Sequence, residues 1–246
     1  MLGLVGCGGP PRIDRAPDAI EMDRLATLAA TAPEVGWSAR GRARIESQDG
    51  TVEGALTAVM DLPRRLRVEV SSRALFGMVG ERVVVSLPGD EHILLYRARE
   101  ETLEREPFAT SSLAQRLPTG ALEELHALVT GRPPWPGGRP PADLAARTRV
   151  IGCSPDGRQV RYRVQLPDSV SSFELEIQDS VLLRLVWSGR ATGPCEVRYD
   201  GWRRWGEIEQ PSRMRLRAPQ EELEVEIRLD EVQARSDFAP TDFEVY

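Results

Sequence analysis

The sequence predicts a mainly β protein with a few helices, in which a curved antiparallel sheet of about eleven strands forms an incomplete β-barrel covered by a helical lid. Two observations predict this fold. Most of the chain alternates apolar and charged residues with a period of two, as strands do when one face is buried. Turn residues separate these segments at short intervals, which favours antiparallel pairing, and so large a sheet curls rather than staying flat.

The first predicted element is a helix over residues 17–32. Pro17 suits a first helical turn, Leu25 and Leu28 lie on roughly one face, and Pro33 ends the pattern. We expect this helix and the few others to cover the apolar, concave face of the sheet.

A hairpin follows this helix. Residues 37–45 alternate apolar with polar side chains, a turn at Asp49 and Gly50 reverses the chain, and residues 52–60 return. The clearest alternation is in residues 222–230, where leucine, valine and isoleucine alternate with charged residues. The other segments of this kind are 65–70, 78–86, 91–97, 160–166, 173–178, 181–187, 195–199, 203–209 and 213–217.

The middle of the chain is helical and then irregular. Residues 111–117 suggest a short helix, and Thr119 can cap a second helix over 122–129 that stops at Gly131. Residues 131–141 are rich in glycine and proline and are typical of a loop. We do not place a domain boundary there, because segments with the same alternation resume afterwards.

The first residues favour lipid modification. Leu4-Val5-Gly6-Cys7 resembles a bacterial lipobox, whose cysteine receives diacylglycerol, and a Gly- and Pro-rich tether follows it. Six residues precede Cys7 and none is basic, unlike a complete secretory signal peptide, so an incidental cysteine is the alternative. We predict diacylglycerol and acyl groups such as palmitate on Cys7, a lipobox and tether over 1–16, and a single domain over 17–246.

A lipid on Cys7 would hold the protein durably on a membrane, because each buried methylene contributes roughly 0.8 kcal/mol. Gly8 follows the cysteine. The lipoprotein resemblance implies that a residue other than aspartate at this place directs sorting to the outer membrane. We therefore expect the protein at the periplasmic face of the outer membrane.

The charged residues exclude one class of partner. A net charge of −6 opposes binding of nucleic acid, whose phosphates attract basic surfaces. All 32 basic residues are arginine. The planar guanidinium recognises carboxylates and phosphates, but a GC-rich genome would give the same bias, and the arginines fall on the polar alternation as they would on a solvated face.

No group of residues predicts catalysis or a metal site. His92 lies beside a turn and His126 lies in a helix without acidic or cysteine partners at ligand spacing, so both are expected to be surface or satisfied histidines. The acidic pairs Glu100–Glu101 and Glu123–Glu124 are expected to face solvent. Since no phosphate-binding loop, nucleophile elbow or Cys-x-x-Cys motif is found, we predict a non-enzymatic protein without cofactor or metal.

Cys153 and Cys195 could form a disulfide in an oxidising periplasm. About four strands of a meander would separate them, however, and strands about 4.8 Å apart put non-adjacent cysteines beyond the roughly 7 Å reach of a disulfide. The spacing favours two thiols, and the disulfide remains the alternative.

The order of these elements resembles the LolA/LolB family of periplasmic lipoprotein carriers and outer-membrane receptors. The matching segments are the first helix and 37–43, 66–70, 75–77, 83–87, 122–133 and 211–245, the last with Phe238 and Phe243. The resemblance covers most of the chain as a pattern. It implies an incomplete antiparallel barrel with a helical lid and an acyl-binding cavity.

The same resemblance implies a role for Leu75 and Phe76. In this family a protruding hairpin with an exposed leucine helps to place lipoproteins in the membrane, and Leu75 and Phe76 occupy the matching position. The alternative is that both side chains tuck under the sheet.

These features predict a lipoprotein, anchored in the outer membrane, that binds acyl chains in an apolar cavity and acts as a chaperone in lipoprotein or lipid localisation. Its partners would be acyl chains or lipoproteins, the membrane surface through its anchor, and a periplasmic carrier protein. The alternative is a structural or sensor lipoprotein that binds a protein partner in the cell envelope and has an interior filled by side chains.

Overall fold

The computed structural model describes residues 12–30, 35–48, 50–61, 65–72, 82–87, 92–97, 101–111, 122–168, 171–188 and 193–245. The strands are β1 (Arg12–Arg15), β2 (Trp37–Ser47), β3 (Gly50–Asp61), β4 (Arg65–Ser71), β5 (Arg82–Leu87), β6 (His92–Arg97), β7 (Thr102–Pro107), β8 (Thr148–Cys153), β9 (Gln159–Gln165), β10 (Ser172–Gln178), β11 (Val181–Ser188), β12 (Cys195–Trp205), β13 (Ile208–Ala218) and β14 (Leu223–Ala234). The α-helices are α1 (Ala19–Ala30), α3 (Leu122–Val129) and α4 (Leu144–Arg147), and the 3-10 helices are η1 (Phe108–Thr110), η2 (Pro136–Gly138), η3 (Pro219–Glu221) and η4 (Pro240–Phe243).

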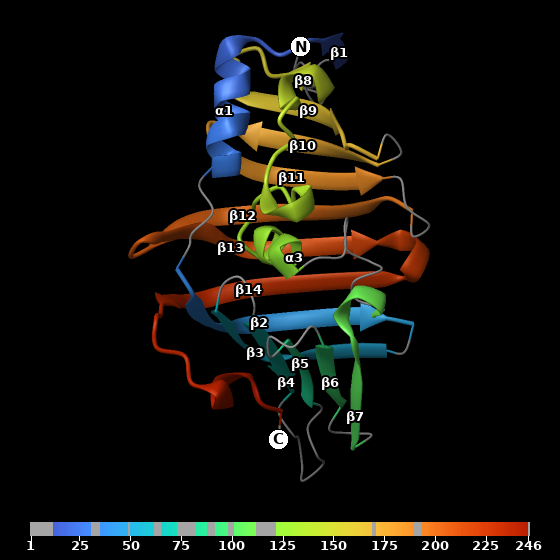
Figure 1. The fold of residues 1–246 in the computed structure, drawn as a ribbon, viewed down its shortest axis with the longest axis vertical. Helices are drawn as coiled ribbons and strands as arrows, with labels where there is room; N and C mark the ends of the chain where they lie inside the picture. The colour runs from blue at the N-terminus through green and yellow to red at the C-terminus, as the bar shows by residue number, and fades with distance from the viewer. Residues whose placement is uncertain are drawn as a thin grey trace, which may run out of the picture.

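All these strands belong to one sheet. Its order is β1-β8-β9-β10-β11-β12-β13-β14-β2-β3-β4-β5-β6-β7, and every neighbouring pair is antiparallel. β1 and β7 are its two edges, so the sheet curls without closing into a barrel (Figure 1). The prediction of a mainly β protein with an open, curved antiparallel sheet and few helices is confirmed.

The sheet has fourteen strands within the described residues rather than about eleven. β1 consists of residues 12–15, which the sequence suggests as tether, and it pairs with β8. Four residues are too few to show an alternation. β7 is exposed along almost its whole length, so no buried apolar side chains mark it in the sequence.

The predicted strand over residues 203–209 is wrong. β12 continues to Trp205, the chain reverses at Gly206, and β13 begins at Ile208. Gly206 has a φ of +65°, which glycine adopts without a steric penalty in a two-residue hairpin loop. In the sequence, the alternation of apolar side chains continues across this glycine, so residues 203–209 resemble a single strand.

Helices α1 and α3 lie over the same face of the sheet (Figure 1), which we call the inner face. The hydroxyl of Tyr162 on β9 donates to the carbonyl oxygen of Glu21 on α1 at 3.1 Å. Leu25 of α1 is fully buried against the sheet. The predicted helix over 122–129 is confirmed, and the helix predicted over 17–32 is present as α1 over Ala19–Ala30, with residues 31 and 32 outside the described residues. The core lies between these helices and the inner face.

The Gly- and Pro-rich segment 131–141 also belongs to the core. It is irregular, as predicted, apart from η2. Trp135 in this segment is 3% exposed, and its ring centroid lies 5.8 Å from that of Phe173 on β10. The loop thus packs down onto the inner face instead of projecting into solvent.

The C-terminal segment packs at the other end of the sheet. The hydroxyl of Ser86 on β5 donates to the carbonyl oxygen of Phe243, which is buried. The guanidinium of Arg65 on β4 lies 4.6 Å from the centroid of the Phe243 ring. These contacts attach η4 to β4 and β5 and bury side chains that the curled sheet would otherwise expose.

Candidate functional site

The register of the sheet gathers apolar side chains in two rows on the inner face. The first row is Leu216, Val225, Ile45 and Val52, and the second is Met214, Ile227, Ala43 and Gly54. Residues directly opposite each other on paired strands share a face. The first row continues through Val197, Leu185 and Leu175 to Tyr162, the residue that contacts α1. Both rows therefore face the helices.

The helices cover the inner face unevenly. On β10 and β11 the side chains of Phe173, Leu175 and Leu185 are at most 1% exposed, beneath α1 and the segment that carries Trp135. On β13, β14, β2 and β3 the large apolar side chains of the two rows are only half-buried. We call these six side chains the inner strip: Leu216, Val225, Ile45, Val52, Met214 and Ile227.

The C-terminal end of α3 forms the cover beside this strip. Gly131 follows the helix with a φ of +73°, and a Cβ atom there would lie 2.6 Å from the Trp202 ring. Only glycine allows both this conformation and this approach. The predicted stop of the helix at Gly131 is thus explained by a contact between α3 and β12.

The side chains of Arg132 and His126 lie in this cover, and burial shifts the pKa of both. Burial lowers the pKa of Arg132 to about 10, and the nearby carboxylate of Glu209 opposes the shift. Burial also lowers the pKa of His126 to about 4, and the positive charge of Arg132 adds to this effect. The Nε2 atom of His126 is buried and has no hydrogen-bond partner among the described residues. His126 is thus neither a surface nor a fully satisfied histidine.

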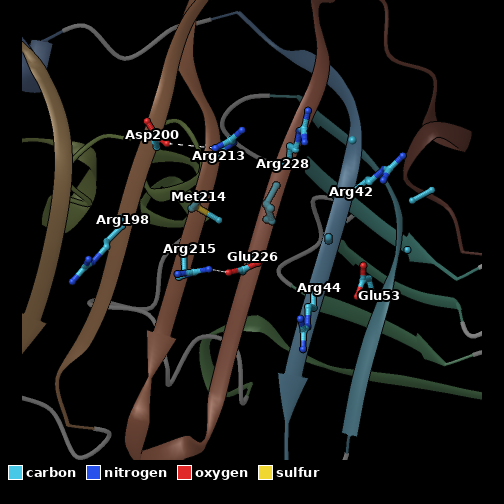
Figure 2. A pocket seen from close by; sticks show the side chains of 15 residues that line it. Arg42, Arg44, Glu53, Arg198, Asp200, Arg213, Met214, Arg215, Glu226 and Arg228 are labelled. Atoms are coloured by element: carbon cyan, nitrogen blue, oxygen red, sulfur yellow. Dashed lines mark hydrogen bonds and ion pairs between the residues drawn. The ribbon is translucent and has the colours of Figure 1, made fainter.

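The hollow that Figure 2 shows lies on the opposite, outer face. Arg42 and Arg44 belong to β2, and they alternate with Gly41 and Ala43 of the inner face. The hollow has a volume of about 1000 Å³. Its lining side chains are mostly charged, in contrast to the apolar cavity that the sequence suggests. Long arginines rise around small residues such as Ala55, which leaves the space between them open.

The structure describes the positions of some of the remaining candidate residues but not of others. Cys7, Leu75 and Phe76 lie outside the described residues. His92 is half-buried on β6. Glu124 is buried at 1% exposure, so the expectation that it faces solvent is wrong, because α3 turns this side of its surface towards the protein.

No disulfide joins Cys153 and Cys195. Cys153 is on β8 and Cys195 is on β12, with three strands between them in the sheet. At about 4.8 Å per strand the two residues are far beyond disulfide reach. The two-thiol state favoured by the sequence is confirmed.

The described part of the chain contains no group of three His, Cys, Asp or Glu side chains placed to hold a metal ion. None of its helices is both long and apolar enough to cross a bilayer.

Sequence reasoning missed three buried residues in the cover and beneath it: Trp135, Arg132 and Gln210. The amide of Gln210 on β13 is fully buried, and neither of its polar atoms has a partner among the described residues. A tryptophan within a proline-rich loop was the available signal for Trp135, since so large an apolar side chain seldom stays in water. The burial of Arg132 and Gln210 has no comparable signal in the sequence.

The amino-acid sequence matches no protein-family model and no curated relative. Solved structures do match it. A LolA superfamily protein from Nitrosomonas europaea aligns with a TM-score of 0.52 at 8% identity, over 91% of this chain and 97% of that one. A DUF1329 family protein from Desulfovibrio piger aligns with a TM-score of 0.54 at 11% identity, over 94% and 98%. The likeness extends over nearly the full length of both chains, and the protein has a LolA-like open-barrel fold.

Proposed function

We propose that this protein is a lipoprotein of the bacterial cell envelope that binds acyl chains of lipids or lipoproteins on the inner strip, without catalysis. The observation that carries the proposal is the half-buried state of the strip on a sheet whose inner side chains on β9, β10 and β11 are sealed beneath the helical cover. The LolA-like fold supports it, because the sequence resembles lipoprotein carriers and receptors built on that fold.

The strip has the size and chemistry for a hydrocarbon chain. Its first row crosses four adjacent strands, which at about 4.8 Å per strand gives a path of roughly 14 Å. Its second row lies about 7 Å further along the strands. Each methylene buried there would contribute about 0.8 kcal/mol. A hydrocarbon chain that buries six methylenes on the strip therefore gains about 5 kcal/mol, before the cost of ordering the chain.

Titration of the protein with a fluorescent fatty acid tests this proposal. We expect saturable binding, and we expect Ile45→Glu to weaken it about tenfold or more, because a carboxylate within the strip must lose water when a chain covers it. The matched control is Thr57→Glu, which places the same charge on the exposed outer face of β3 and should leave the affinity unchanged.

Two results would contradict the proposal. Wild-type protein that shows no saturable binding would remove the acyl-binding role and favour a lipoprotein that binds a protein partner. Equal weakening by Ile45→Glu and Thr57→Glu would show that the inner strip is not the binding surface.

The proposal includes anchoring and membrane contact outside the described residues. Acyl groups on Cys7 would hold the protein at the periplasmic face of the outer membrane, and mass spectrometry of membrane-derived protein would detect their mass. Leu75 and Phe76 would enter the bilayer while cargo passes to or from a periplasmic carrier.

The hairpin role is tested in a Cys7→Ser background, which removes the anchor. There we expect Leu75→Glu combined with Phe76→Glu to reduce liposome binding by about a hundredfold or more, because two apolar side chains of roughly 1.5–3 kcal/mol each are replaced by charges. Flotation with liposomes measures it, and an unchanged urea midpoint verifies folding. Equal flotation of both proteins would remove the assignment.

A further inference from the structure

The outer face carries three arginines directly opposite one another on adjacent strands. Arg213 of β13 lies opposite Arg228 of β14, and Arg228 lies opposite Arg42 of β2. We call these three residues the arginine row. It ends at Ala55 of β3, which lies opposite Arg42 and carries no charge.

The neighbouring row on the same strands has the opposite pattern. It alternates in sign from strand to strand: Arg215, Glu226, Arg44 and Glu53. Alternating charges of this kind stabilise paired strands, and like charges directly opposite each other destabilise them. The arginine row therefore destabilises the pairing of these strands, whereas the adjacent row of alternating charges stabilises it.

Few carboxylates compensate the arginine row. Asp200 lies 3.8 Å from Arg213 and Asp230 lies 3.6 Å from Arg228, and all four side chains are more than half exposed. Exposed pairs at such distances contribute little. Arg42 has no ion pair or hydrogen bond with any described residue.

Another pair of facing arginines, on β8 and β9, has a carboxylate partner for each guanidinium group. Arg149 of β8 lies opposite Arg163 of β9. Each has its own carboxylate at 2.8 Å, Asp14 for Arg149 and Glu174 for Arg163. The arginine row lacks such partners among the described residues, so an anion from outside the chain would find its guanidinium groups available.

The row stands in the hollow of about 1000 Å³ shown in Figure 2. The small side chain of Ala55 lies on the outer face between the charged side chains, and Gly41, Ala43 and Gly54 on the same strands also line the hollow. Six arginines and three carboxylates line it, although the whole chain has a net charge of −6. Arg44 and Arg198 at its rim are paired with Glu46 and Glu196, so the excess positive charge is concentrated in the arginine row.

The backbone beside Arg228, one member of the row, is irregular. The register between β14 and β2 shifts between Leu229 and Glu231, immediately after Arg228. The carbonyl oxygen of Arg228 would lie 2.0 Å from a Cβ atom at Gly41. Such a bulge re-aims the side chains beside it, and a glycine permits the close approach.

We propose that the arginine row binds a phosphate group. Guanidinium groups hold phosphate oxygens through paired, charge-assisted hydrogen bonds, and a phosphate carries up to about two negative charges against the three positive charges of the row. The group could belong to a phospholipid headgroup or to a soluble phosphate compound. The site lies on the opposite face from the inner strip, and it does not depend on acyl binding.

Calorimetric titration of the full chain with inorganic pyrophosphate tests the soluble source. We expect saturable binding that weakens as salt is added, because exposed charges are screened. Arg42→Gln combined with Arg213→Gln should weaken it about tenfold or more, since each lost charged hydrogen bond has a large effect. Arg149→Gln combined with Arg163→Gln, which removes the same charge from compensated arginines, should leave binding within about twofold of wild type.

The same proteins are then mixed with phosphatidylcholine vesicles that contain or lack phosphatidic acid. Binding that requires phosphatidic acid and the arginine row supports a lipid headgroup, and binding of pyrophosphate alone supports a soluble ligand. The melting temperature of the Arg42 and Arg213 variant should equal or exceed that of wild type, because a like-charge contact is removed. Wild-type protein that binds neither probe, or a row variant that binds both as wild type does, would overturn the proposal and leave the fatty-acid result unaffected.

Discussion

Replacing Trp135 with alanine is expected to lower the free energy of unfolding by about 3–5 kcal/mol, the range found when large aromatic side chains are removed from cores. The ring is 3% exposed and packs against Phe173 of β10. It packs the proline-rich segment against β10. Removing it leaves a cavity whose walls are held in place by α1 and by the strands. Urea denaturation measures the change through the transition midpoint and its slope.

Trp135→Phe is the matched control. The indole Nε1 atom is buried and has no hydrogen-bond partner among the described residues, so phenylalanine keeps most of the packing and removes an unsatisfied donor. We expect a cost below about 1.5 kcal/mol for this change. If the free energy of unfolding of the alanine variant lies within about 1 kcal/mol of the wild-type value, then the segment does not contribute to the core and the packing described for it is wrong.

The sequence predicted the inner face of the sheet well, because this face follows a local rule. In residues 37–45 and 222–230 every second side chain is apolar, and the structure places both segments as paired strands, β2 and β14, with these side chains towards the helices. The helix over 122–129 was equally accessible, since its spacing of leucines and its terminal glycine are both local signals.

Other elements of the fold gave weaker signals. β1 has four residues and β7 is largely exposed, so neither shows an alternation. Around Gly206 the alternation continues through a hairpin loop, and only the φ of +65° marks the reversal. In each case the strand is defined by its pairing partner rather than by its own residues.

The arginine row could not be found in the sequence for a similar reason. Arg42, Arg213 and Arg228 each occupy an ordinary polar position on their own strand. They become a cluster only when the registers of β13, β14 and β2 are known. A shift of one residue in either pairing would have placed a side chain of the inner face opposite an arginine. The feature depends on register, which hydrophobic periodicity alone leaves undetermined.

The burial of His126 predicts a pH dependence of stability. The pKa of this histidine is lowered to about 4 in the folded protein by burial and by the charge of Arg132, against about 6.5 in the unfolded chain. Between these values the unfolded chain binds a proton that the folded protein does not. Stability is therefore complete above about pH 6.5 and is lost progressively as the pH falls towards 4.

We expect this loss to reach about 3 kcal/mol, from a difference of about 2.5 pKa units at 1.36 kcal/mol per unit. Urea denaturation of wild type and His126→Leu between pH 7 and pH 4 measures it as a difference between two slopes, so the titration of carboxylates common to both proteins cancels. If His126→Leu loses stability with falling pH as steeply as wild type does, then the imidazole is not held neutral at the end of α3. The burial of a neutral His126 in the cover beside the inner strip would then be disproved, because a charged imidazole next to Arg132 requires access to water.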